Sequence, residues 1–185
     1  SQDPLNDELK RLYSTENFTD VTIDKQDYQD GIAVTFIVDE KPVIDDVVFK
    51  GNTAFKAHKL KSMMKSKPND MLNLAMLAQD ITEIKNFYVK KGYPLAEVKY
   101  VLDLDKEPNK ARITITIDEK MHVKVTRISI TGNKAIKINA IRKILATKPA
   151  WLFNPGIFNE GILKEDTEKI KYLYDDIGYL DAEVT

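Results

Sequence analysis

The sequence predicts an α+β fold made of tandem β-α-α-β-β modules, each with two helices covering one face of a three-stranded sheet. The first support is that short motifs recur at a nearly constant spacing. The motif FKGN at 49–52 returns as ITGN at 130–133, and GYPLAEV at 92–98 returns as GYLDAEV at 178–184. A repeat of about 80 residues suits a small domain with its own core. The second support is that β-rich runs and helical apolar stripes follow in the same order within the copies.

The composition narrows the class of protein further. The chain has 185 residues, of which 43% are hydrophobic, so we expect a packed core. Its net charge is −1, so nothing in the overall charge suggests a phosphate-binding surface. No run approaches the roughly 18 apolar residues that a membrane-spanning helix needs. The absence of cysteine excludes thiol chemistry and suits a cytoplasmic or an exported protein equally well. The first four residues, SQDP, are typical of an expression-vector remnant, so we expect the natural N-terminus to be missing.

The middle copy, residues 42–120, contains every element of the module. A β-rich run at 43–49 ends at a turn that contains Gly51. Apolar residues at helical spacing predict a first helix over 57–64. Pro68 then breaks this helix, because proline disfavours helical geometry in the residue before it.

A longer helix and two strands complete this copy. An apolar stripe predicts the helix over 74–88, and we expect a glycine to cap its C-terminus in the left-handed conformation. β-rich runs follow at 95–104 and 111–117, and the second alternates isoleucine with threonine, which indicates one buried and one exposed face. The glycines assigned structural roles in the turns and caps are Gly51, Gly92, Gly132 and Gly178.

The third copy, residues 121–185, repeats this order without its last strand. It has a predicted strand at 123–130 and helices over 138–145 and 163–174. The connection between these helices, at 149–156, accounts for the five extra residues in the second repeat spacing.

The first copy, residues 5–41, supplies only the end of a module. It has the end of a helix and strands at 19–25 and 32–38, so we expect its first strand and first helix upstream. The boundaries between copies, at 41–42 and 120–121, are very short, and we expect a semi-rigid rod.

The sequence offers only weak candidates for catalysis or metal binding. His58 and His122 fall in different copies, and neither has a clustered carboxylate partner. Asp103, Asp105 and Glu107 alternate along one strand face, but they lack the glycine and terminal glutamate of a calcium loop. Phosphate-loop and nucleophile motifs are absent from the sequence. We therefore expect no enzymatic activity, no cofactor and no bound metal.

The connection between the two helices of the third copy is unusually apolar. It contains Trp151, Leu152, Phe153 and Phe158 in a stretch that also carries proline and glycine. One interpretation is that the loop folds back over the helix pair or a domain junction. The other is that it contacts another protein, because aromatic residues are enriched in interface cores.

These motifs together resemble the POTRA (polypeptide-transport-associated) domain family. LYSTENFTDV at 12–21 resembles the end of the first POTRA domain of an outer-membrane β-barrel assembly factor, and VFKGN at 48–52 resembles the start of the second. PAWLF at 149–153, followed by YLY and GY, resembles the third. The resemblance covers essentially everything after Pro4. It implies a vector remnant at 1–4, the C-terminal part of POTRA 1 at 5–41, POTRA 2 at 42–120, and POTRA 3 without its last strand at 121–185.

The resemblance implies a non-enzymatic scaffold in the periplasm, attached to the membrane through a C-terminal β-barrel. Assembly factors with such domains receive unfolded outer-membrane proteins, dock accessory lipoproteins and help to insert their clients. The resemblance also implies that the strand after the second helix of the third copy lies at the edge of its sheet. A partner can add a strand to such an edge through backbone hydrogen bonds. The residues of this edge are Leu180, Asp181, Ala182, Glu183, Val184 and Thr185.

Three alternatives remain open at this point. The chain can be the POTRA region of another translocation or secretion factor, which the number of domains in the whole protein would decide. An RNA-binding α+β repeat would need a basic sheet face with stacking aromatic residues, and the near-neutral charge favours no nucleic-acid partner. An enzyme would need a pocket with convergent titratable groups, for which the sequence offers no candidate.

Overall fold

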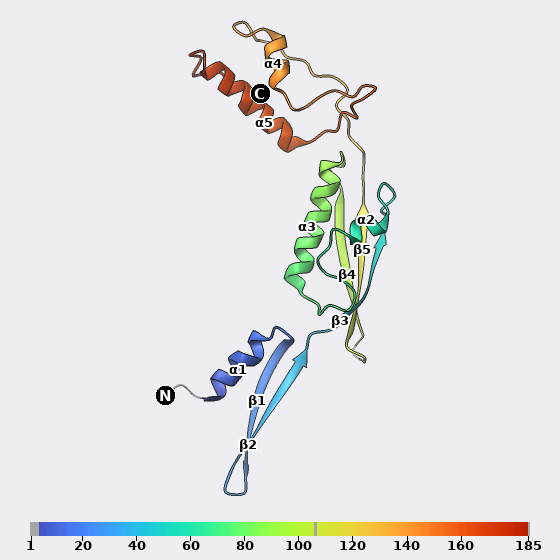
Figure 1. Cartoon of the computed structure of the whole chain (residues 1–185), viewed down its shortest axis with the longest axis vertical. Helices are drawn as coiled ribbons and strands as arrows, with labels where there is room; N and C mark the ends of the chain where they lie inside the picture. The colour runs from blue at the N-terminus through green and yellow to red at the C-terminus, as the bar shows by residue number, and fades with distance from the viewer. Residues whose placement is uncertain (1–3, 106, 185) are drawn as a thin grey trace. The chain divides into compact units, whose positions relative to one another are not determined.

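The computed structural model describes residues 4–105 and 107–184 (Figure 1). In chain order its elements are α1 (Pro4–Ser14), β1 (Phe18–Tyr28), β2 (Gly31–Glu40), β3 (Val43–Lys50), α2 (Ala57–Lys61), α3 (Leu74–Lys90), β4 (Glu97–Asp105), β5 (Lys110–Asp118), α4 (Ile138–Ile144) and α5 (Glu160–Asp175). The predicted α+β class is confirmed. Among the described residues, no helix combines the length and the hydropathy required to cross a bilayer. The predicted vector remnant lies outside the described residues, apart from Pro4.

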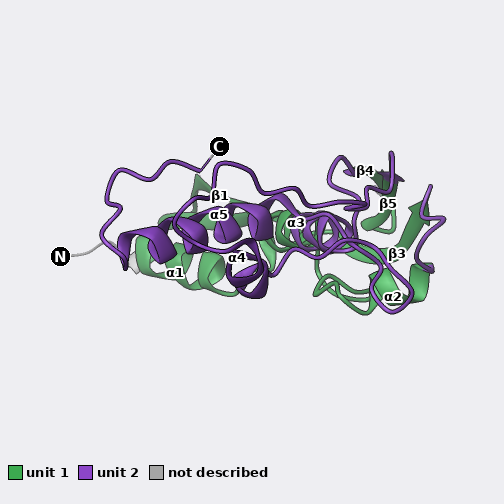
Figure 2. Cartoon of the chain, turned by 90° about the horizontal axis from the view of Figure 1, so that it is seen from above, with its two compact units in different colours: residues 1–50, 57–81, 99–116 green, residues 51–56, 82–98, 117–185 purple. Residues whose placement is uncertain are grey.

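Two compact units divide the chain, and each has its own buried apolar side chains. The first unit comprises residues 1–50, 57–81 and 99–116, and the second comprises 51–56, 82–98 and 117–185 (Figure 2). The buried apolar residues of the first unit are Val21, Ile44, Val47, Leu60, Met64, Leu72, Leu77, Ala111, Ile113 and Ile115, and those of the second are Ile84, Tyr88, Ala96, Ile117, Ile141 and Leu145. Both units therefore draw on residues of the middle copy.

The first copy contributes a helix and a two-stranded antiparallel sheet. β1 and β2 form a hairpin in which Tyr28 pairs with Gly31 across the turn. Gln29 occupies the turn with a positive φ of 51°. The strands predicted at 19–25 and 32–38 are confirmed, and both extend further than the sequence pattern indicates.

The middle copy contains a three-stranded sheet in the order β3-β5-β4. β3 runs parallel to β5, with a shift in register between Ile44 and Asp46. The alternation predicted for β5 is confirmed, because Ile113, Ile115 and Ile117 are buried while the residues between them are more exposed. This order places β5 in the centre of the sheet and β4 at one edge.

Two helices separate the first strand of this sheet from the others. The first is shorter than the 57–64 predicted and ends at Lys61. The second begins after Asn73, whose Oδ1 accepts a hydrogen bond from the N–H of Met76 at 3.0 Å and so satisfies one donor of the first turn. The order β-α-α-β-β is therefore the one that the apolar patterns predict.

Gly92 lies just after the end of α3 and adopts the left-handed conformation, with φ +92°. Gly178 lies just after the end of α5 and adopts the same conformation, with φ +87°. A β-carbon at Gly92 would lie 2.6 Å from Nε2 of His122, which is closer than real side chains approach. The backbone oxygen of Gly92 also accepts a hydrogen bond from the N–H of Val123 at 2.8 Å. Gly92 is thus required by its φ and by the close approach of the chain that leaves β5.

A buried aspartate joins the two helices in both the middle and the third copy. Asp80 in α3 accepts hydrogen bonds from the N–H groups of Lys65 and Ser66, at 2.8 and 2.9 Å. In the third copy, the carboxylate of Asp166 in α5 makes the same pair of bonds with the residues that follow α4. Both carboxylates are fully buried. Each one accepts hydrogen bonds from N–H groups in the irregular segment that follows a short helix, and so satisfies donors that no regular secondary structure pairs.

The third copy forms its two helices but not its predicted first strand. Residues 123–130 contain no strand, and only Lys124 makes an isolated bridge, with Ile157. A strand needs a partner, and in the middle copy the partner of β3 is β5. Among the described residues, the third copy has no strand that takes the place of β5. The strand predicted at 123–130 is therefore wrong for this structure, because no strand is available to pair with it there.

Candidate protein-docking surfaces

The described residues contain no group of three or more His, Cys, Asp or Glu side chains that could hold a metal ion. His58 lies in α2, remote in sequence from His122, which follows β5. Nε2 of His122 is 3.1 Å from the backbone oxygen of Lys91, and its ring lies 4.8 Å from that of Tyr93. His122, at the start of the third copy, therefore packs against Lys91 and Tyr93 of the middle copy.

Two acidic residues of β4 line a depression that also contains cations. Asp103 and Asp105 line a surface depression together with Asp45, Lys110 and Arg112. The Lys110 ammonium lies 2.9 Å from a carboxylate oxygen of Asp45, and the Arg112 guanidinium lies 3.6 Å from the other. The hydrogen bond from Lys110 lowers the pKa of the Asp45 carboxyl group. This mixture of charges is typical of a solvated sheet face.

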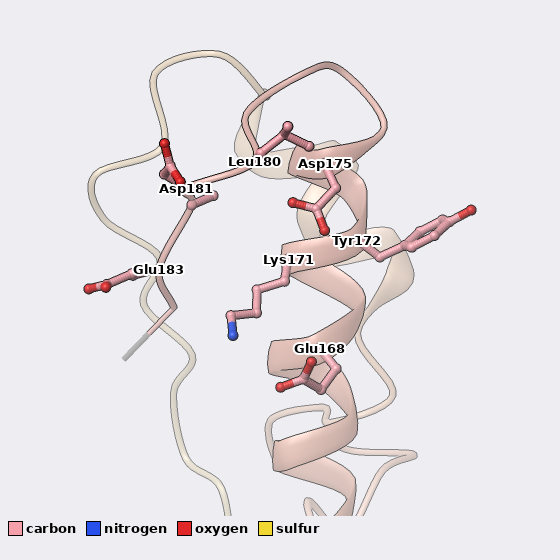
Figure 3. A pocket seen from close by; sticks show the side chains of 8 residues that line it. Glu168, Lys171, Tyr172, Asp175, Leu180, Asp181 and Glu183 are labelled. Carbon is pink, nitrogen blue, oxygen red and sulfur yellow. The ribbon is translucent and has the colours of Figure 1, made fainter.

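The C-terminal segment is not the edge strand that the sequence predicts. Residues 180–184 form a turn and then an irregular segment beside α5, and Thr185 lies outside the described residues. Figure 3 shows this segment next to the helix, with Lys171 extending into the space between them. The residues lining this depression are Glu168, Lys171, Tyr172 and Asp175 of α5 and Leu180, Asp181, Ala182 and Glu183 of the segment. The strand predicted for Leu180, Asp181, Ala182, Glu183 and Val184 does not form in this structure, in which the described residues of the third copy contain no strand that could pair with it.

The corresponding strand of the middle copy does lie at a sheet edge. β4 follows α3 and Gly92 in the same way that residues 180–184 follow α5 and Gly178. In the order β3-β5-β4, β4 has a neighbouring strand on one side only. Val101 and Leu104 on this strand are 65% and 56% exposed. The middle copy therefore presents the edge that the sequence analysis assigns to the third.

The apolar loop of the third copy exposes most of its aromatic and aliphatic side chains. Trp151, Leu152 and Phe153 are 65%, 86% and 80% exposed, and Phe158 is half-buried. The rings of Trp151 and Phe153 meet edge to face, with their centroids 5.4 Å apart. Side chains this exposed do not cover the helix pair, so the geometry favours the second interpretation of the loop, a contact with another surface.

The structure contains a hydrogen-bond network around Glu119 that the sequence analysis does not predict. Its carboxylate accepts hydrogen bonds from the Thr53 hydroxyl, the Ala54 N–H at 2.9 Å and the Tyr88 hydroxyl at 2.9 Å. Burial raises the pKa of Glu119, but these bonds outweigh burial and lower it. Glu119 belongs to the motif DEK, which occurs at 39–41 and again at 118–120, and this repetition is the sequence feature that points to it. Glu119 ties the turn after β3 to α3, which is a structural role.

Comparison with known proteins identifies the module. The family model described as "POTRA: Surface antigen variable number repeat" matches residues 42–120 and 123–185. The outer membrane protein assembly factor BamA of Nitratidesulfovibrio vulgaris is 27% identical over 185 residues, which cover 98% of this chain and 23% of that protein. BamA of Neisseria meningitidis serogroup B is also 27% identical, with coverage of 95% and 22%. The chain thus spans less than a quarter of the length of these relatives.

Solved structures with similar chains include the N-terminal domain of Omp85 from Thermosynechococcus elongatus and POTRA domains 3–5 of Haemophilus influenzae BamA. The match to the first is 22% identical, covers 94% of this chain and 72% of the solved chain, and has a TM-score of 0.48. The second is 17% identical, covers 97% and 71%, and has a TM-score of 0.46. The resemblance to POTRA domains is confirmed by the family match. Because that match extends over most of the sequence, the chain belongs to the POTRA family.

Proposed function

We propose that this chain is the periplasmic scaffold region of an outer-membrane β-barrel assembly factor. The proposal is supported by the two POTRA matches and by the similarity to BamA over nearly the whole chain. In this proposal the scaffold is not an enzyme. It receives unfolded outer-membrane proteins, docks accessory lipoproteins, and is anchored by a C-terminal β-barrel.

The domains of this scaffold follow the boundaries that the repeat predicts. Residues 5–41 are the C-terminal part of a first POTRA domain, residues 42–120 are a second, and residues 121–185 are a third without its last strand. The family match at 42–120 and 123–185 supports the second and third boundaries.

Partners bind partly by adding a strand to the edge of a module. The observation that carries this step is the position of β4 at the edge of the β3-β5-β4 sheet. An extended client segment placed beside β4 would form backbone hydrogen bonds whatever its sequence, and alternate side chains would contact one face of the sheet. Unfolded transmembrane β-strands suit this mode, because their residues alternate between apolar and polar. One edge can therefore accept many different clients.

We extend this proposal to the equivalent segment of the third module, residues 180–185, in a state in which it pairs with a neighbouring strand as β4 does. The repeat supports this assignment, because GY at 92–93 precedes β4 and GY at 178–179 precedes this segment. Backbone pairing, rather than particular side chains, is then the source of affinity at Ala182 and its neighbours.

Proline and serine at one position in the full-length protein test this proposal. Ala182→Pro removes a backbone donor, whereas Ala182→Ser keeps it. The amount of folded β-barrel protein in the outer membrane of cells is the readout, and a thermal melt of each purified variant checks folding. We expect the proline to reduce barrel assembly strongly and the serine to have little effect. Normal assembly with a folded Ala182→Pro protein, or equal loss with both variants, would contradict recognition through this edge.

A further inference from the structure

The Trp151 loop is a built turn rather than an irregular excursion. The Trp151 N–H donates to the Asn154 oxygen at 2.9 Å, and the Asn154 N–H donates back to the Trp151 oxygen at 3.0 Å. These two bonds close a tight turn with Leu152 and Phe153 at its tip. Turn tips normally carry glycine, asparagine or aspartate, so two large apolar side chains at this position require an explanation.

The base of the turn is held in place by the chain that leaves the middle copy. Val125 donates to the oxygen of Gly156 and accepts from the N–H of Ala150, both at 2.7 Å. Gly156 lies so close to Ala150 that a β-carbon at Gly156 would lie 2.6 Å from the Ala150 β-carbon. The apolar tip is therefore presented by a fixed backbone, and little conformational freedom remains to be lost on binding.

A cationic depression begins where this base ends. It is lined by residues that directly follow Val125 and directly precede Ala150, together with residues of α4 and the segment after it. Its lining residues are Thr126, Arg127, Ile128, Arg142, Leu145, Thr147, Lys148 and Pro149. Arg127, Arg142 and Lys148 are its only charged residues.

The sequence around the turn is cationic throughout, which the net charge of −1 conceals. Between residues 121 and 159 there is no Asp or Glu. The same stretch carries seven cations, namely Lys124, Arg127, Lys134, Lys137, Arg142, Lys143 and Lys148. The balancing acids lie elsewhere, and eight of them fall between residues 160 and 185.

We propose that the Trp151–Asn154 turn and its cationic depression form a docking site for a bilayer surface that carries anionic phospholipid headgroups. Leu152 and Phe153 enter the boundary between headgroups and acyl chains, and Trp151 lies at the headgroup level, where its amphipathic ring is favoured. Arg127, Arg142 and Lys148 contact lipid phosphates. The tip protrudes from a turn, and the sequence on both sides of it and the lining of the depression contain cations and no acids. This combination suits a charged, deformable apolar surface better than a preformed protein pocket, which would need to match three exposed side chains at once.

The chain carries its own probe for this site, because Trp151 is its only tryptophan. The full 185-residue chain is mixed with vesicles of phosphatidylglycerol and phosphatidylcholine, or of phosphatidylcholine alone. We expect Trp151 emission to shift to shorter wavelength and the protein to sediment with the anionic vesicles, both at low salt, and both effects to weaken as salt increases. Inorganic phosphate alone should leave the emission unchanged, which separates a lipid surface from a free anion.

Two double variants and a control locate the interaction. Leu152→Ser with Phe153→Ser keeps the tryptophan and should lower vesicle partitioning at least about tenfold, because two exposed apolar side chains no longer enter the bilayer. Arg127→Gln with Lys148→Gln should lower it about 25-fold, since each cation near an anionic surface contributes about fivefold. Lys25→Gln with Lys67→Gln removes the same charge from exposed positions in the first unit and should change partitioning little.

Three results would overturn the proposal. The first is the absence of an emission shift with anionic vesicles at low salt. The second is equal vesicle partitioning of the Leu152/Phe153 variant and the unaltered chain. The third is a loss of partitioning in the Lys25/Lys67 control variant as large as that in the Arg127/Lys148 variant. A thermal melt of each variant establishes that the substitutions at these exposed positions leave the chain folded.

Discussion

The buried aspartate of the third copy provides the sharpest test of how the module is held together. Asp166 accepts hydrogen bonds from the N–H groups of Ala146 and Thr147, at 2.8 and 2.7 Å, and from the Lys169 ammonium at 3.0 Å. Burial raises the pKa of Asp166, but the bonds to the charged form outweigh burial and lower the pKa from 3.8 to about 2. The carboxylate is therefore more stable in the folded chain than in the unfolded one.

Replacing this aspartate by asparagine separates the charge from the shape. Asp166→Asn turns one acceptor oxygen into an NH₂ group, which then faces a backbone N–H and leaves that buried donor unpaired. An unsatisfied buried donor costs about 1–3 kcal/mol, and the lost charge-assisted bond adds to this. We expect the free energy of unfolding at pH 7 to fall by about 2–4 kcal/mol.

The pH dependence of this effect has a definite sign. Because the folded pKa of Asp166 lies below its unfolded value, the charge contributes about 2 kcal/mol above pH 4, and this is lost as the pH falls through about 2. Asp166→Asn lacks this contribution at every pH. The difference in unfolding free energy between the unaltered chain and the variant should therefore shrink by about 1 kcal/mol between pH 7 and pH 3.

Urea unfolding followed by circular dichroism measures these free energies, and hydrogen exchange of the Thr147 amide reports on the site itself. Asp80→Asn in the middle copy is the matched variant, because Asp80 makes the same two bonds to Lys65 and Ser66. It should accelerate exchange at Ser66 and leave Thr147 unchanged. A cost below about 0.5 kcal/mol for Asp166→Asn, the usual range for surface substitutions, or unaltered exchange at Thr147, would refute the reasoning.

Three further substitutions test other parts of the account. Gly92→Ala should lower the unfolding free energy by about 1–2 kcal/mol, because residue 92 has a positive φ. The new β-carbon should also displace the His122 ring and shift its NMR signals, and unshifted ring signals would contradict this contact. Tyr88→Phe should cost about 1 kcal/mol in urea unfolding, because it removes the hydrogen bond to Glu119, and a neutral result would mean that the network is not stabilising. Ile113→Ala should cost about 2–5 kcal/mol by the same measurement, because this side chain is fully buried in the central strand, and a cost under 1 kcal/mol would contradict that position.

The middle copy could be predicted from sequence because all its elements are present. The alternation of isoleucine and threonine in β5 and the apolar stripe of α3 are local patterns that already agree with the final packing. The third copy failed where pairing is non-local. The segment at 123–130 is β-rich in composition, but a strand also needs a pairing partner, and the described residues supply none for it or for 180–184.

The residues that sequence reasoning missed are polar groups whose role depends on burial. Asp80 and Asp166 stand 86 residues apart, which is the spacing of the two GY motifs, so the repeat itself carries a signal for these aspartates. Glu119 lies in the repeated DEK motif, and its bonds to Thr53 and Tyr88 join segments far apart in sequence. The exposure of Leu152 and Phe153 depends on backbone bonds that close the turn, which composition alone does not predict.

The most direct test of the proposed scaffold function is an NMR titration of the isotope-labelled chain with a peptide that alternates apolar and polar residues, as a transmembrane β-strand does. We predict that amide shifts concentrate along β4, an edge strand that exposes Val101 and Leu104, because the other edge strand, β3, is bonded at its start to residues 69–72. Tyr100→Pro and Val101→Pro sharpen the test, since successive N–H groups of a strand point to opposite sides. In one of the two variants the lost N–H group points away from β5, and this variant should keep its fold and lose peptide binding. Shift changes confined to other elements, or unaltered peptide affinity in both variants, would contradict recognition through the sheet edge.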